Sequence, residues 1–364
     1  MADAADSALT RLADQVRGAA AARRPLAIRA GGTKDFYGNP VDGERLDPRG
    51  YAGIIAYEPT ELVVTARAGT ALADLEAALA GSGQMLAFEP PHFGAQATVG
   101  GCIAAGLAGP RRAAVGGASG AIRESLLGVR LLDGSGTVLR FGGTVIKNVA
   151  GYDVSRLLAG SLGTLGVLLE ASIRVVARPV AEQTRRVALG AVAALERCCD
   201  WQCASLPLSA SCWEDGVLSV RLSGAETAVS AAARVIGGEA LEPAAASEFW
   251  AAVREQTLPF FARAPVLWRV AVPPTAAALE LPGEQLVEWA GGLRWLSTSA
   301  DPAAIRARAA ALGGHATLFR GRVPGVPAFA PLAPALARLN ARLRAEFDPA
   351  GIFNPGRLHA DAVH

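Results

Sequence analysis

Two glycine pairs are the residues of this sequence best suited to hold an anion. The first pair, Gly31-Gly32, follows a predicted short strand at 25–30 and is followed by Thr33 and Lys34. Glycine permits unusual dihedral angles and close approach, so the backbone amides of such a loop can converge on a phosphate, while the lysine adds positive charge. Taken alone, however, the stretch is better explained as a plain turn.

The second pair, Gly100-Gly101, opens the small-residue segment 102–107 and is preceded by Thr98 and Val99. If this segment is a helix, its N-terminus would offer free N–H groups and the positive end of its dipole to a phosphate. Close packing of alanine and glycine explains the same residues equally well, and the motif alone does not decide between the two.

A third glycine-rich stretch, 147–176, reads KNVAGYDVSRLLAGSLGTLGVLLEASIRVV. Tyr152–Ala159 is predicted to form a short helix, and Gly160 stands where helices commonly end in a left-handed residue. The β-branched and aliphatic residues of 167–176 then predict a buried strand.

The five cysteines are Cys102, Cys198, Cys199, Cys203 and Cys212. Their odd number, without a secretion signal, argues against a disulfide framework. The last four lie close enough in sequence for a metal or iron–sulfur site to be considered, but the CCxxxC spacing matches neither the usual zinc nor the usual ferredoxin pattern. We therefore expect buried thiols and no metal.

Composition limits the class of protein. A chain of 364 residues with 51% hydrophobic residues favours two domains, and a net charge of +2 without a basic run does not indicate nucleic-acid binding. The opening stretch 1–17 predicts an amphipathic helix with Leu9, Leu12 and Val16 on one face, and it lacks the apolar core of a signal peptide. No apolar stretch reaches the roughly 18 residues that span a bilayer. We expect a cytoplasmic protein without a transmembrane segment.

The elements that must position these loops are predicted from periodicity. In the first half we expect a subdomain that carries the first glycine loop and a second subdomain that contains a β-hairpin and the stretch 147–176. The first comprises strands 51–57, 62–68 and 85–88 and a helix 71–80 capped by Thr70; the hairpin comprises strands 126–132 and 137–141. No GxGxxG unit joins a strand to a helix, which disfavours a nicotinamide site.

After Pro179 the glycine-rich loops stop and helices alternate with strands. The predicted helices are 191–204, 225–235 and 247–257, the predicted strands are 218–222, 266–272 and 293–298, and a last helix covers 332–347. Leu336, Leu339, Leu343 and Phe347 are spaced to share one face of that last helix.

Four motifs in a fixed order resemble the FAD-binding domain of the p-cresol methylhydroxylase and vanillyl-alcohol oxidase superfamily. They are RAGGTKD (29–35), ATVGGCIAAGLAGPRR (97–112), the stretch 147–176 and FDPAGIFNPGR (347–357). The chain is most similar to the branch that contains glycolate oxidase subunits and D-lactate dehydrogenases. GGHATLFRG together with the final motif resembles the smaller, FAD-binding E subunits of glycolate oxidases.

The resemblance implies an α+β fold in three parts. Residues 1–178 would form a two-subdomain FAD-binding domain, 179–318 an antiparallel-sheet cap, and 319–364 a C-terminal helix and tail that return to the FAD-binding domain. FAD would lie extended between the two subdomains, below the cap.

The resemblance also implies which residues contact FAD. Those of the first loop, which holds the pyrophosphate, are Arg29, Gly31, Gly32, Thr33, Lys34 and Asp35. The others are Thr98, Val99, Gly100 and Gly101 of the second loop, Ile173 beside the adenine and Asn354 near the flavin ring. Thr33-Lys34 stands where some relatives carry a flavin-linked histidine, which excludes that bond. Cys102, where relatives often carry asparagine, is either a flavin-linked thiol or a buried small residue.

Catalytic residues are harder to assign. Removing hydride from a hydroxy acid requires a base for the hydroxyl and a cation for the carboxylate. Catalytic relatives carry a cap-domain histidine pair and a later Glu-His, often with a divalent metal. This chain has only His92, His315, His359 and His364, with neither motif. We predict no catalytic residue and no metal ligand.

By resemblance, the expected function is that of an FAD-binding subunit of a glycolate oxidase complex. A second flavin subunit would carry the substrate chemistry and an iron–sulfur subunit would complete the complex, while the flavin of this chain serves electron transfer or assembly. The alternatives are a self-sufficient 2-hydroxy-acid dehydrogenase and a structural subunit with a degenerate flavin site. The intact glycine pairs speak against the last. Peripheral membrane association through the complex stays open.

Overall fold

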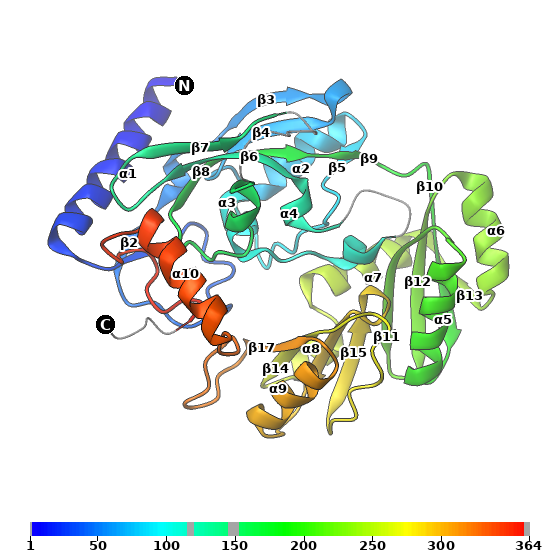
Figure 1. Cartoon of the computed structure of the whole chain (residues 1–364). Coiled ribbons are helices and arrows are strands. Elements are labelled where there is room, and N and C mark those ends of the chain that lie inside the picture. Colours follow the sequence, from blue (N-terminus) through cyan, green and yellow to red (C-terminus); the bar gives the residue numbers. More distant parts are fainter. Residues whose placement is uncertain (1, 115–119, 145–152, 360–364) are drawn as a thin grey trace.

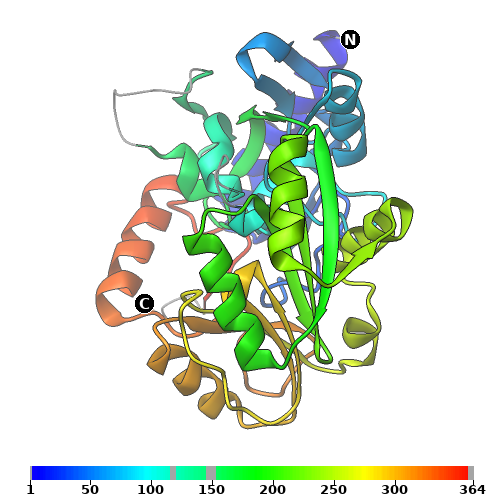
Figure 2. The same cartoon turned by 90° about the vertical axis from the view of Figure 1, so that its right-hand side faces the viewer.

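The computed structural model describes residues 2–114, 120–144 and 153–359 of the chain. Two sheets dominate it, one above the other in Figure 1, and the second view in Figure 2 shows helices on the outer side of the lower sheet. The α-helices are α1 (Ala2–Ala22), α2 (Leu72–Gly81), α3 (Val99–Ala105), α4 (Ile122–Ser125), α5 (Ala191–Cys203), α6 (Glu226–Ile236), α7 (Pro243–Glu255), α8 (Pro259–Arg263), α9 (Pro302–Ala311) and α10 (Pro334–Phe347). Short 3-10 helices are η1 (Pro48–Gly50), η2 (Pro59–Glu61), η3 (Pro110–Ala113), η4 (Ser155–Leu158) and η5 (Trp289–Gly291).

The upper sheet has five antiparallel strands in the order β3-β4-β8-β6-β7. They are β3 (Ile54–Glu58), β4 (Val63–Arg67), β6 (Leu126–Leu132), β7 (Val138–Gly142) and β8 (Val167–Arg174). The helices α2 and α3 share one apolar core with this sheet, because the aliphatic residues of β4, β6 and β8 point toward them. The β6–β7 hairpin confirms the prediction for 126–141.

A smaller unit lies beside this sheet. It contains the parallel pair β1 (Leu26–Ile28) and β2 (Glu44–Leu46), with α1 packed across it. Leu12 and Val16 of α1 are buried against Leu26, as the periodicity of the stretch 1–17 predicts, and the C-terminal tail bridges to β1 at Phe353. Segments from both ends of the chain therefore complete this unit.

The predicted division of strands between the two subdomains is wrong. Strands β3 and β4 were expected beside the first glycine loop, but β4 pairs with β8, with Val64 opposite Ile173. This pairing buries β4 in the interior of the sheet and joins two segments that lie far apart in the sequence. Periodicity fixes which face of a strand is buried but does not identify its neighbour.

Local predictions around the loops had mixed outcomes. Gly160 has a φ of 84°, which confirms the left-handed position. The Thr70 cap is wrong: α2 begins after Ala71 without a side-chain cap, and the Thr70 hydroxyl accepts a hydrogen bond from Gly53 N instead. Of the predicted helix 152–159, the described part is the 3-10 helix η4, and the KNVAGY segment (147–152) lies outside the described residues.

Two short strands complete the first half of the fold. They are β5 (Gln84–Met85) and β9 (Val176–Ala177), which pair antiparallel with each other. The strand predicted at 85–88 is thus shorter and begins one residue earlier. Beyond Met85 the chain turns toward Glu89, whose positive φ cannot continue a strand.

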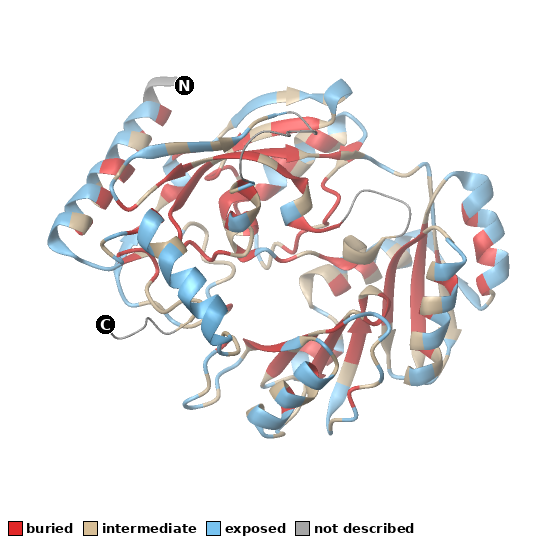
Figure 3. Cartoon of the chain, in the orientation of Figure 1, coloured by how far each residue is buried: buried red, intermediate tan, exposed pale blue. Residues whose placement is uncertain are grey.

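The lower sheet has eight antiparallel strands in the order β13-β10-β12-β11-β15-β16-β14-β17. They are β10 (Ala181–Ala188), β11 (Leu208–Glu214), β12 (Val217–Gly224), β13 (Glu239–Leu241), β14 (Leu267–Ala271), β15 (Glu284–Glu288), β16 (Leu293–Ser297) and β17 (His315–Arg320). Helices α5, α6 and α9 cover its outer face. Its inner face forms a core with α7, α8 and residues of the first half of the chain, so the lower sheet and its helices, here called the cap, are attached by shared apolar packing (Figure 3).

The last helix is more exposed than its sequence predicts. Phe347 is buried, but Leu336 and Leu339 are 52% and 62% exposed, so only the C-terminal half of the expected apolar face meets the protein. The carboxylate of Asp348 then accepts hydrogen bonds from Ile352 N and Phe353 N, which turns the tail back toward β1.

The cysteines are free, and Cys102, Cys198 and Cys212 are buried as expected. The expectation of buried thiols is wrong for Cys203, which is exposed on the last turn of α5. In the described part of the chain, no three His, Cys, Asp or Glu side chains are grouped as metal ligands. Nor does any helix there combine the length and apolar character needed to cross a bilayer.

Candidate functional site

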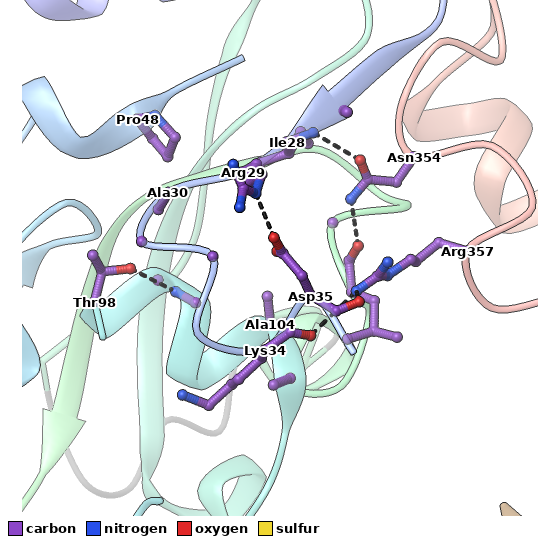
Figure 4. Close-up of a pocket in the computed structure, with 18 of the residues that line it drawn as sticks. Ile28, Arg29, Ala30, Lys34, Asp35, Pro48, Thr98, Ala104, Asn354 and Arg357 are labelled. Carbon is purple, nitrogen blue, oxygen red and sulfur yellow. Dashed lines mark hydrogen bonds and ion pairs between the residues drawn. The ribbon is translucent and has the colours of Figure 1, made fainter. Parts of the chain in front are cut away.

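A cavity of about 360 Å³ lies where the two subdomains, the loop 161–166 and the C-terminal tail meet (Figure 4). This volume is within the usual range for a ligand pocket. Ten of the residues predicted to bind the cofactor line it: Arg29, Gly31, Gly32, Thr33, Lys34, Asp35, Thr98, Gly100, Gly101 and Asn354. The structure thus brings together loops from opposite ends of the chain.

The first glycine loop presents the donors expected for an anion. Within the described residues, the backbone amides of Gly31, Gly32, Thr33 and Lys34 have no hydrogen-bond acceptor in the protein. Gly32 has a φ of 71°, a conformation that glycine adopts without strain. Consecutive unpaired amides in such a turn form a concave site for an anion such as a pyrophosphate.

The second glycine loop contributes shape rather than donors. Its predicted free amides are wrong, because Val99 N and Gly100 N donate to the carbonyls of Thr70 and Ala68 and Gly101 N donates to the Thr98 hydroxyl. A Cβ on Gly100 would lie 2.7 Å from the Ala68 Cβ, so this glycine lets α3 pack against the end of β4. The small-residue face of α3 thereby leaves open space on the cavity side.

Gly31 is also required by the protein itself. A Cβ at this position would lie 1.7 Å from the carbonyl oxygen of Gln96. The first glycine loop and the segment before Thr98 are therefore in direct backbone contact, and the cavity wall depends on glycine before any ligand arrives.

The C-terminal tail closes the cavity through Asn354. Its Oδ1 accepts a hydrogen bond from Ile28 N at 2.7 Å, and its Nδ2 donates to the Leu162 carbonyl at 2.6 Å. Asn354 is 5% exposed, and both it and Leu162 have positive φ values, 41° and 50°. Strained backbone of this kind persists where surrounding contacts fix it. The amide side chain thus ties β1, the 161–166 loop and the tail together.

Arg357 acts beside Asn354 on the first glycine loop. Its guanidinium donates to the carbonyls of Lys34 and Asp35 at 3.3 and 3.2 Å, and to that of Asn39 at 2.9 Å. Burial lowers its pKa from the ordinary value, but an arginine remains charged. This cation therefore contacts carbonyl groups of the first glycine loop, whereas the four loop amides named above have no acceptor in the described protein.

Sequence reasoning did not select several residues that line the cavity. They are chiefly Ala104, Ser161, Leu162, Gly163, Gly166 and Arg357. Two signals could have found them. Ala104 follows Gly100 by four positions, so the two share one face of α3. The glycines of GSLGTLG mark a loop in which backbone approaches a ligand, which is a common use of closely spaced glycines.

Three other candidate residues lie away from the cavity lining. Val99, Cys102 and Ile173 belong to the core between the helices and the upper sheet. Ile173 pairs with Val64 on one side and with Leu126 on the other, whereas the first residues of β8 line the cavity. Burial raises the pKa of the Cys102 thiol to about 12, which makes it a poor nucleophile. A contact of Ile173 with adenine stays a prediction.

The described histidines are not part of the cavity lining. His92 Nε2 lies 3.0 Å from the Glu76 carboxylate, and His315, on strand β17, has a pKa lowered by burial and by Arg269. His359 contacts the Phe329 ring, and His364 lies outside the described residues. None of the described histidines is placed as a base on the cavity wall.

Aromatic side chains fill the space between the first glycine loop and the cap. The Phe36 ring lies 5.4 Å from Phe93 and 5.3 Å from Phe319, and Phe319 lies 4.8 Å from Trp295. Edge-to-face pairs at such distances are favourable beyond the area they bury. This aromatic cluster therefore packs the cap against the first glycine loop, and its four rings are not among the residues that line the cavity.

Comparison with known proteins decides the family. Residues 9–142 match a family described as "FAD binding domain". The chain is 47% identical over 350 residues to the glycolate oxidase subunit GlcE of Escherichia coli (strain K12), and the match covers 96% of this chain and 97% of that protein. The chain belongs to the GlcE family. Its members are flavoproteins of the oxidoreductase class, and the cofactor of this chain is FAD.

More distant similarities agree with the GlcE assignment. The glycolate oxidase subunit GlcD of Bacillus subtilis (strain 168) is 32% identical over 133 residues, which are 36% of this chain and 27% of that protein. A structure of alkyldihydroxyacetonephosphate synthase superposes with a TM-score of 0.65 at 14% identity, over 95% of this chain and 75% of that one. The predicted fold class, a two-subdomain FAD-binding domain with an antiparallel-sheet cap, is confirmed.

Proposed function

We propose that this chain is the FAD-binding subunit of a glycolate oxidase complex and that it does not oxidise glycolate itself. A partner flavin subunit would convert glycolate to glyoxylate, and an iron–sulfur subunit would take part in passing electrons onward. The similarity to GlcE over nearly the whole chain supports membership in such a complex, since that relative is named as a subunit of glycolate oxidase.

The observation that carries the proposal is the chemistry of the cavity lining. The first glycine loop offers unpaired amides and Lys34, which suit a pyrophosphate, and none of the described histidines is among the lining residues. When bound, FAD supplies reversible electron transfer at its flavin ring. The residues of this chain would hold the cofactor and exclude water from it, and no described histidine lies where it could take a hydroxyl proton.

One observation favours the alternative of a self-sufficient dehydrogenase. Glu288 and Arg269 of the cap line a second cavity, of about 20 Å³, at the boundary with the FAD-binding domain. Burial raises the pKa of Glu288 to about 7, which suits a proton acceptor, and an arginine can pair with a substrate carboxylate. This cavity holds about one water molecule, so a hydroxy acid would fit only after the cap moved.

Reconstitution of the complex tests the proposal. Partner subunits are combined with either the native chain or an Ala104→Phe variant, whose larger side chain should fill the cavity and keep FAD out, and dye reduction by glycolate is followed. We expect both to assemble and only the flavin-loaded complex to turn over at the full rate. Full turnover with the flavin-free chain would leave it an assembly role alone. Turnover by the native chain without partners would favour the dehydrogenase alternative.

A further inference from the structure

The segment 89–96, here called the strap, runs between the first glycine loop and the cap. It contains three positive φ angles, at Glu89 (40°), Phe93 (53°) and Gly94 (136°), two of them at residues other than glycine. Such conformations are retained where neighbouring contacts impose them. The contacts of the strap on its two sides show what holds it.

On the cavity side, the strap contacts the first glycine loop along its length. The Gln96 carbonyl touches Gly31, and a Cβ on Gly94 would lie 3.4 Å from the Thr33 methyl group. The Lys34 ammonium donates to the His92 carbonyl at 3.1 Å and lies 5.6 Å from the centre of the Phe93 ring. The direction of the lysine side chain therefore depends on the His92–Phe93 peptide.

On the cap side, a carboxylate holds that same peptide. Glu255, the last residue of α7, accepts hydrogen bonds from His92 N at 3.1 Å and from Phe93 N at 2.8 Å. The neighbouring Arg254 donates to the same carboxylate at 2.9 Å. A charged acceptor that receives two adjacent amides fixes the peptide more firmly than a neutral one would.

A second ion cluster holds the start of the strap. The Glu89 carboxylate accepts from Arg221 of the cap at 2.8 Å and from Arg111 N at 3.1 Å. The two arginines keep the pKa of this carboxyl below its ordinary value despite its burial. The strap is thus anchored to the cap at both Glu89 and His92–Phe93.

The charges around Lys34 also link it to Glu255. Burial lowers the pKa of its ammonium, and the Glu255 carboxylate raises it. Of the other groups that face it, the Cys102 thiol is protonated at neutral pH because its pKa is about 12. Among the groups that face Lys34, Glu255 is therefore the anion that favours the charged form of this buried lysine.

We propose that Glu255 is a positioning residue for Lys34. By holding the His92–Phe93 peptide, the cap carboxylate aims the lysine ammonium at the FAD cavity, so that docking of the cap and binding of FAD are coupled. The proposal goes beyond the function proposed above, because it holds whether or not the chain oxidises substrate.

The test is a double-mutant cycle read out as the Kd of FAD for the apoprotein. Glu255→Gln and Lys34→Met are each expected to weaken FAD binding by about tenfold, the effect of losing a hydrogen bond that involves a charged group. The double variant should bind FAD no more weakly than Lys34→Met alone. Glu248→Gln, an exposed carboxylate on the same helix, is the matched control and should change Kd by less than about twofold.

If the double variant weakens FAD binding by the product of the two single effects, Glu255 acts independently of Lys34 and the proposal is overturned. An unchanged Kd of FAD in Glu255→Gln would overturn it as well.

The pH dependence of FAD binding gives a second readout. FAD affinity that depends on charged Lys34 should fall as the pH is raised. In Glu255→Gln this fall should begin at a lower pH than in the native chain, because removing the carboxylate lowers the lysine pKa. Equal transitions in both proteins would contradict the coupling. If Glu255→Gln does not fold, Glu255→Asp, which withdraws the carboxylate by one methylene, replaces it under the same criteria.

Discussion

Replacing Asn354 by alanine tests whether the tail builds the cofactor cavity or only passes beside it. The substitution removes the acceptor of Ile28 N and the donor to the Leu162 carbonyl, and Asn354 is only 5% exposed. Water cannot easily replace either partner at such a site, so both backbone groups would be left unsatisfied.

The size of the effect follows from those two groups. An unsatisfied buried donor or acceptor costs about 1–3 kcal/mol, and the φ of 41° at this position adds about 1 kcal/mol against a residue that is not glycine or asparagine. Movement of the neighbouring loops should relieve part of the cost of the unsatisfied Ile28 amide and Leu162 carbonyl. We therefore expect a loss of about 3 kcal/mol in the free energy of unfolding. Asn354→Asp should lose less from the Ile28 contact, since a carboxylate still accepts, but it places a negative oxygen against the Leu162 carbonyl.

Urea unfolding of the apoprotein measures the stability, and titration with FAD measures the affinity. We expect Asn354→Ala to unfold at clearly lower urea and to bind FAD at least tenfold more weakly, because three cavity walls lose their common tie. Asn340→Ala on the exposed face of α10 is the control and should change stability by less than about 0.5 kcal/mol. A loss below about 1 kcal/mol with unchanged FAD affinity for Asn354→Ala would refute the reasoning.

Three further predictions follow from the site and the cap. Ala104→Phe should give folded protein without the flavin absorption band, because the larger side chain fills the cavity from α3; a normal flavin content would place FAD elsewhere. Gly31→Val should instead lower the yield of folded protein, because its side chain would collide with the Gln96 carbonyl, and circular dichroism of a stable, folded variant would contradict this. Glu288→Gln should raise stability at pH 8 by up to about 3 kcal/mol over the native chain and by little at pH 4.5. The folded-state pKa of Glu288 is raised to about 7, so the native chain loses stability as the pH rises from about 4.5 to 7. Glutamine avoids this loss and still accepts the hydrogen bond from Trp295. Equal urea midpoints of the two proteins at pH 8 would show that the carboxyl carries no such penalty.

The parts of the fold that depend on local chemistry could be read from the sequence. The turn between β6 and β7 and the left-handed Gly160 follow from glycine positions, and the aliphatic run of β8 follows from residue type. The first glycine loop could also be placed, because four consecutive amides without partners need only glycine and a sharp turn. These features are decided by short-range contacts along the chain.

The features that the sequence did not reveal depend on distant partners. The amides of Val99 and Gly100 look free in a helix N-terminus, yet Thr70 and Ala68, which follow strand β4, satisfy them. Leu339 looks like a core residue by spacing, but nothing in the described structure covers it. Spacing shows which residues share a face, while the element opposite that face is set by tertiary packing.

The central claim is that the chain carries flavin without oxidising glycolate. The most direct measurement is the visible absorption spectrum of the chain purified alone, before and after anaerobic addition of glycolate. We predict a flavin spectrum that glycolate leaves unchanged and that a chemical reductant bleaches. Bleaching by glycolate alone would contradict the account and place the base and the substrate cation within this chain, with Glu288 and Arg269 as the first residues to replace.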